Sequence, residues 1–78
     1  MKYKILVAED DNDIVKILKL YLDNSGFEVV YVDNGMDALK KIQEEHIDLA
    51  LLDLIMPIMN GYELTKNIRE ISNIPILI

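Results

Sequence analysis

The sequence predicts an α/β fold in which a doubly wound parallel sheet is built from strands that alternate with helices. Short apolar runs alternate with segments whose apolar residues recur at helical spacing, in the order strand, helix, strand, helix, strand, helix, strand. This order favours parallel strands joined by right-handed crossovers. The run over residues 47–53 is almost continuously apolar, as is typical of a strand covered on both faces.

The first half of the sequence predicts two strands with one helix between them. We expect strands over residues 3–8 and 27–32, and Glu28 indicates that the second strand is less buried. Asp11 or Asn12 can cap the intervening helix, and Ser25-Gly26 ends it. The expected core face of this helix carries Ile14, Ile17, Leu18, Tyr21 and Leu22, and Val15 and Leu20 widen it. The Val15 side is either the margin of a core helix or a docking surface.

The second half repeats the same alternation. Asn34 can cap a helix that carries Ala38, Leu39 and Ile42. A strand over 47–53 and a loop over 56–61 follow, the loop being marked by Pro57 and Asn60-Gly61. Leu64, Ile68 and Ile71 then indicate a third helix, and residues 75–78 open a fourth strand.

Composition limits the class of protein. A chain of 78 residues with 51% hydrophobic residues can form one small domain with a core. Its net charge of −6 argues against direct binding to a nucleic-acid backbone, and the lack of cysteine excludes disulfides and thiolate metal sites. Its apolar runs are too short to span a membrane and no signal-peptide pattern is present, so we expect a cytoplasmic protein without membrane contact.

Acidic residues follow two of the predicted strands. Glu9 and Asp10 come after the first strand, and Asp53 ends the third. In open parallel sheets, ligands bind beyond the carboxyl ends of the strands. If the two strands are neighbours, three carboxylates meet there, and their repulsion calls for a cation. A divalent ion with oxygen ligands, such as Mg²⁺, suits this donor set.

The same position suggests phosphoryl chemistry. The Asp53 carboxylate could attack a phosphorus centre and form an acyl phosphate, with Mg²⁺ lowering the charge repulsion. The alternative is that Asp53 only ends a strand and accepts turn hydrogen bonds, while Glu9 and Asp10 form a solvated acidic loop. We assign no chemistry to Asp11, Asn12 or Asp13, because acidic and amide groups are favoured at the start of a helix.

The order and spacing of these residues resemble a known family. Residues 4–11, Lys-Ile-Leu-Val-Ala-Glu-Asp-Asp, followed by residues 53–61, Asp-Leu-Ile-Met-Pro-Ile-Met-Asn-Gly, are similar to the receiver domain of bacterial two-component response regulators. The resemblance covers the whole chain. It implies a flavodoxin-like fold and a phosphoprotein that acts as a signalling switch, not a classical enzyme, with at most self-catalysed phosphoryl transfer and dephosphorylation.

The resemblance also assigns roles to residues. It implies that Asp53 accepts a phosphoryl group from a phosphohistidine of a sensor histidine kinase. Asp10 would hold Mg²⁺ directly and Glu9 mainly through water, and the Ile55 backbone carbonyl would complete the protein ligands together with Asp53. Glu9 stands where an aspartate is commoner in the family, a replacement that the family tolerates.

The C-terminal end departs from the family pattern. Residues 1–78 correspond to the N-terminal portion of a receiver domain, without the later Ser or Thr, the Lys and the elements that relay phosphorylation. A DNA-binding output domain would lie outside this chain, so the parent protein is expected to be a transcriptional regulator. The apolar end at Ile76-Leu77-Ile78 is expected to pair with another copy along the sheet edge, which light scattering would detect as a dimer mass.

The sequence leaves two other functions open. A Mg²⁺-dependent phosphatase with an aspartyl nucleophile would usually carry a second acid two residues after Asp53, where this chain has Ile55. A receiver-like interaction module that is never phosphorylated would usually lose the aspartate or the acidic pair, and this chain keeps both.

Overall fold

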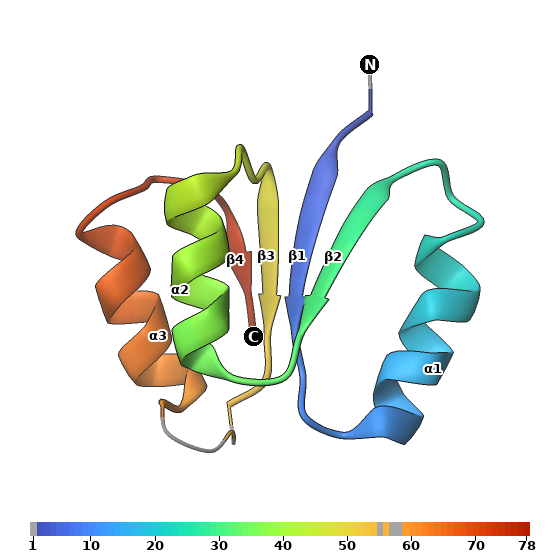
Figure 1. The fold of residues 1–78 in the computed structure, drawn as a ribbon, viewed down its shortest axis with the longest axis horizontal. Coiled ribbons are helices and arrows are strands. Elements are labelled where there is room, and N and C mark those ends of the chain that lie inside the picture. The colour runs from blue at the N-terminus through green and yellow to red at the C-terminus, as the bar shows by residue number, and fades with distance from the viewer. Residues whose placement is uncertain (1, 55, 57–58) are drawn as a thin grey trace.

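A computed structural model describes residues 2–54, 56 and 59–78. Strands and helices alternate along this described part of the chain, and every strand pair is parallel, in the order β2-β1-β3-β4 (Figure 1). The elements are β1 (Lys4–Ala8), α1 (Asn12–Leu22), β2 (Glu28–Val32), α2 (Gly35–Glu44), β3 (Leu49–Leu52), α3 (Gly61–Arg69) and β4 (Ile76–Leu77). The predicted alternation and the neighbouring placement of the first and third strands are confirmed.

Short polar side chains begin each helix. An Asp11 side-chain oxygen accepts hydrogen bonds from the backbone N–H groups of Asp13 and Ile14, at 2.9 and 3.4 Å. Asn34 and Asn60 cap α2 and α3 in the same way. These bonds satisfy N–H groups that have no partner inside the helix. The predicted caps Asp11 and Asn34 are confirmed.

The third helix differs from its prediction at both ends. It begins at Gly61, which the sequence placed in the loop, and it ends at Arg69. Ile71 therefore lies beyond the helix and is 48% exposed, so its assignment to the helix was wrong. The chain turns here because the N–H groups of Ile71 and Ser72 both donate to the carbonyl of Ile68. Helical spacing of an apolar residue does not reveal such a turn.

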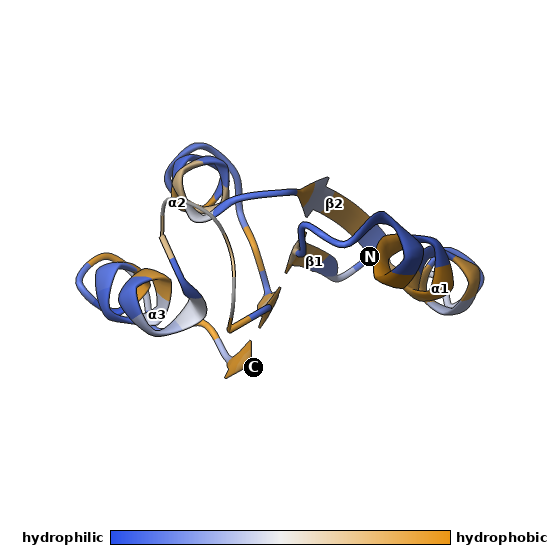
Figure 2. Ribbon diagram, turned by 90° about the horizontal axis from the view of Figure 1, so that it is seen from below, coloured by the Kyte–Doolittle hydropathy of each residue, from blue (hydrophilic) through white to orange (hydrophobic). Residues whose placement is uncertain are grey.

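The main core lies between the sheet and the pair α2 and α3. Figure 2 shows these two helices on one side of the sheet and α1 on the other. The buried cluster on the α2–α3 side takes residues from strands and helices alike, namely Leu6, Ala8, Ala38, Ile47, Ala50, Leu52, Met56, Leu64 and Ile68. Because side chains alternate along a strand, Leu6 and Ala8 enter this core while Ile5 and Val7 face the other side.

The α1 side of the sheet is less covered than the sequence predicted. The structure describes every residue of α1, and none of them is fully buried. Ile14 and Ile17 are 43% and 54% exposed. The helix lies beside β2 and not over the middle of the sheet (Figure 1). As a result Leu49 and Leu51 of β3 are only half-buried. The prediction that α1 is a core helix along Ile14 and Ile17 was therefore wrong.

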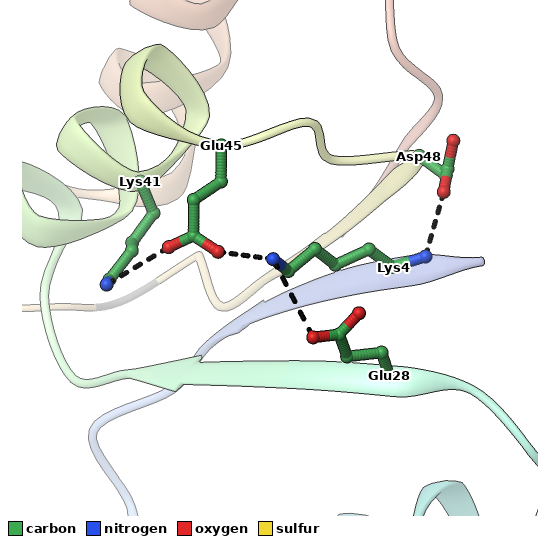
Figure 3. Close-up of polar contacts among 5 residues, drawn as sticks. All are labelled: Lys4, Glu28, Lys41, Glu45 and Asp48. Carbon is green, nitrogen blue, oxygen red and sulfur yellow. Dashed lines mark hydrogen bonds and ion pairs between the residues drawn. The ribbon is translucent and has the colours of Figure 1, made fainter. Parts of the chain in front are cut away.

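A group of charged residues ties the amino end of β1 to its neighbours. The Lys4 ammonium group pairs with Glu45 after α2 and lies 3.8 Å from a Glu28 oxygen on β2 (Figure 3). Glu45 also pairs with Lys41 at 3.1 Å, and the Lys4 backbone N–H donates to Asp48 at 2.8 Å. The start of β1 is thereby joined to β2, to the end of α2 and to the residue before β3, at the end of the sheet opposite the acidic residues.

This group predicts loss of stability in acid. The hydrogen bond from Lys4 holds the pKa of the Glu45 carboxyl below its ordinary value of 4.5. A carboxyl with a lowered pKa stabilises the fold above its ordinary value and loses that effect as the pH falls through the lowered one. We expect the free energy of unfolding to fall below pH 4.5, and Glu45→Gln to flatten this fall. Urea unfolding at several pH values measures it. A Glu44→Gln control that flattens it equally would contradict the role of Glu45.

Candidate functional site

Strand pairing explains the position of two residues of the predicted acidic site. Ala8 of β1 and Leu52 of β3 are partners in the parallel register, so Glu9 and Asp53 each follow a paired residue. The Asp53 N–H donates to the Ala8 carbonyl at 3.0 Å, and the Glu9 N–H donates to the carbonyl of Val32 on β2, also at 3.0 Å. Both main chains are therefore held at the carboxyl edge of the sheet.

The three predicted carboxylates come together there. Glu9, Asp10 and Asp53 each offer an oxygen, and these oxygens lie within 4.8 Å of one another. Glu9 and Asp53 are half-buried, whereas Asp10 is exposed. The juxtaposition predicted from the two strand ends is thus present. Ile55, whose backbone carbonyl was expected to complete the ligands, lies outside the described residues.

Negative charge is concentrated in this cluster. Burial raises the pKa of the Glu9 carboxyl, and the charges of Asp53 and Asp10 raise it further, while a hydrogen bond from the Asp11 N–H opposes the rise. The 3.1 Å bond from Asp11 also orients the Glu9 carboxylate. Hard oxygen donors that repel one another are a suitable site for a divalent cation such as Mg²⁺.

Neighbouring polar residues serve local structure. Asp11 caps α1, as expected. Asp33 also follows a strand, which is the signal that identified Glu9 and Asp53, but its carboxylate accepts a 2.8 Å hydrogen bond from the Asn34 amide.

Val15 lines a groove that also includes Glu9 and Asp33. The Val15 side of α1 therefore lies beside the acidic cluster, as its docking hypothesis requires.

Sequence comparison identifies the family. The model of the response regulator receiver domain matches residues 5–78. The chain belongs to the response regulator receiver domain family. This match confirms the resemblance drawn from the acidic pair and the loop after Asp53. The matched family is a signalling domain and not a classical enzyme.

Individual relatives agree with this assignment. The receiver domain described here is 40% identical over 74 residues to a transcriptional regulatory protein, the CpxR homolog of Haemophilus influenzae. That match covers 95% of this chain and 32% of the relative, so the chain spans about a third of that protein's length.

Solved structures confirm the fold. The receiver domain of the sensor histidine kinase PA1611 from Pseudomonas aeruginosa, solved with a magnesium ion in its active-site cleft, superposes with a TM-score of 0.91 at 28% identity. The match covers 97% of this chain and 65% of that one. A chain in the complex of histidine kinase ThkA with response regulator TrrA superposes with a TM-score of 0.88 at 38% identity. This match covers 97% of the present chain and 66% of the chain in the complex.

The described part of the receiver domain contains no helix that is both long and apolar enough to cross a membrane.

Proposed function

We propose that this receiver domain accepts a phosphoryl group on the Asp53 carboxylate in a Mg²⁺-dependent reaction. The observation that supports it most is the cluster in which oxygens of Glu9, Asp10 and Asp53 lie within 4.8 Å of one another. One carboxylate can act as nucleophile, and all three can help to hold the cation. The resemblance to receiver domains assigns the first role to Asp53, and the family match over residues 5–78 supports that assignment.

The proposed donor is a phosphohistidine of a sensor histidine kinase. A carboxylate oxygen of Asp53 attacks the phosphorus, the P–N bond breaks as the P–O bond forms, and the imidazole leaves with the bonding electrons and takes up a proton. Bound Mg²⁺ supplies positive charge that reduces the repulsion between the carboxylate and the phosphoryl oxygens. Asp10 would hold the ion directly and Glu9 through water, with Asp53 and the Ile55 carbonyl as further ligands. The complex of ThkA with TrrA supports a kinase as partner.

We further propose that the domain catalyses only its own phosphorylation and dephosphorylation, and that the parent protein regulates transcription through a DNA-binding output domain. The name of the Haemophilus relative supports that output. The acidic net charge of −6 fits DNA contact through another domain and not through this one. A cytoplasmic location fits the proposed partner.

The test is labelling of the intact protein by a small phosphodonor such as acetyl phosphate. We expect a single added phosphoryl group, seen by mass spectrometry, when Mg²⁺ is present, and at least about a tenfold slower reaction after chelation with EDTA. The product should be cleaved by hydroxylamine, as an acyl phosphate is. Metal-independent labelling would contradict the role of Mg²⁺, and a product resistant to hydroxylamine would show that the phosphoryl group is not on a carboxylate. Sustained turnover of phosphate monoesters would favour the phosphatase alternative.

A further inference from the structure

Gly61 lies against the main chain of Asp53. It is the first residue of α3, it is buried, and its N–H donates to the Leu54 carbonyl at 3.0 Å. A methyl group built on Gly61 would lie 2.5 Å from the Asp53 carbonyl oxygen and 3.0 Å from Leu54 Cα. Both neighbours are backbone atoms, which cannot move aside as the end of a flexible side chain can.

The requirement for glycine here is steric and not conformational. Among the described glycines only Gly26 has a positive φ, so the backbone of Gly61 is one that any residue adopts. Within a helix alanine is favoured over glycine, so an alanine at this position would otherwise be expected to help the fold. The cost of a side chain at Gly61 therefore comes from the contact with Asp53 and Leu54.

We infer that Gly61 is a positioning residue for the proposed phosphoacceptor. Its close contact sets how far the first turn of α3 lies from the Asp53–Leu54 peptide. On the other side, the Asp53 N–H is held by Ala8. A side chain at position 61 must displace either α3 or this peptide. Moving the peptide shifts the Asp53 carboxylate relative to Glu9 and Asp10, with which it forms the 4.8 Å cluster.

Gly35 provides a matched comparison. It is the first residue of α2, follows an asparagine cap as Gly61 does, and is also buried. A methyl group on Gly35 would lie 2.8 Å from Met59 Cβ and from the Met59 carbonyl oxygen. It would therefore disturb the same connection between β3 and α3 without touching Asp53. An alanine at either position is expected to strain the fold, but only the one at position 61 should disturb the acidic cluster directly.

The experiment compares Gly61→Ala, Gly35→Ala and the unaltered intact protein. Mg²⁺ affinity is measured by calorimetry, the phosphorylation rate with acetyl phosphate, and the folded fraction by circular dichroism. We expect Gly61→Ala to weaken Mg²⁺ binding and slow phosphorylation about tenfold per folded molecule, the effect of a small displacement of a reacting group. Gly35→Ala should change either quantity by less than about twofold, since its contact is with Met59.

The outcomes separate this inference from the proposed function on which it rests. Failure of the unaltered protein to be phosphorylated would overturn the proposed function. A folded Gly61→Ala protein that binds Mg²⁺ and reacts normally would overturn only the positioning role, as would equal losses in the two variants. If Gly61→Ala is partly unfolded, the measurements are repeated in trimethylamine N-oxide, which favours the compact state, and the same criteria apply.

Discussion

Replacing Asp53 with asparagine should abolish phosphorylation by acetyl phosphate and by a cognate kinase. The amide has nearly the same shape as the carboxylate but is a far weaker nucleophile, so the rate should fall by at least about a hundredfold. The fold should persist, because the bond from the Asp53 N–H to the Ala8 carbonyl belongs to the main chain. Without metal the variant should be more stable by about 1 kcal/mol, because one of three mutually repelling charges is removed.

The matched control is Asp33→Asn. Asp33 follows β2 as Asp53 follows β3, but its exposed carboxylate is hydrogen-bonded to Asn34 and it does not belong to the acidic cluster. Intact-protein mass spectrometry should find this variant labelled like the unaltered protein, and thermal unfolding without metal should show no comparable gain. Persistent hydroxylamine-sensitive labelling of Asp53→Asn would mean that another carboxylate is the acceptor.

The acidic site was accessible to prediction because it depends on topology more than on packing. Once the runs containing Ala8 and Leu52 are recognised as neighbouring parallel strands, the residues that follow them must share one edge of the sheet. The caps were accessible for a similar reason, since Asp11 and Asn34 act through hydrogen bonds to residues two or three positions along the chain. Local chemistry and strand order together predict these features.

Packing accounts for what the sequence did not reveal. The apolar spacing of Ile14 and Ile17 predicts which face of α1 is apolar, but not how far that helix lies from the middle of the sheet. Gly61 reads as a turn residue beside Asn60, and its contact with Asp53 depends on the distance between two backbones. The end of α3 before Ile71 likewise depends on which carbonyl its N–H reaches.

Replacing Leu64 with alanine should cause a large loss of stability. Leu64 is fully buried on α3 within the cluster that includes Leu6 and Ala50. Removing a buried leucine side chain costs about 2–5 kcal/mol, because apolar contacts are lost and a cavity remains. A domain of this size is stable by roughly 4–12 kcal/mol. One substitution could thus remove a large share of the stability, which urea unfolding followed by circular dichroism would measure.

Leu20→Ala is the control, because Leu20 lies on α1 and is 69% exposed. The same chemical change there should shift the free energy of unfolding by no more than about 0.5 kcal/mol. Equal losses in the two variants would contradict the placement of the main core between the sheet and the pair α2 and α3. Because α3 also carries Gly61, any Leu64→Ala protein that remains folded tests whether core packing alone affects the acidic site. Because the Gly61 contact with Asp53 is kept in this variant, a folded Leu64→Ala protein should bind Mg²⁺ with normal affinity.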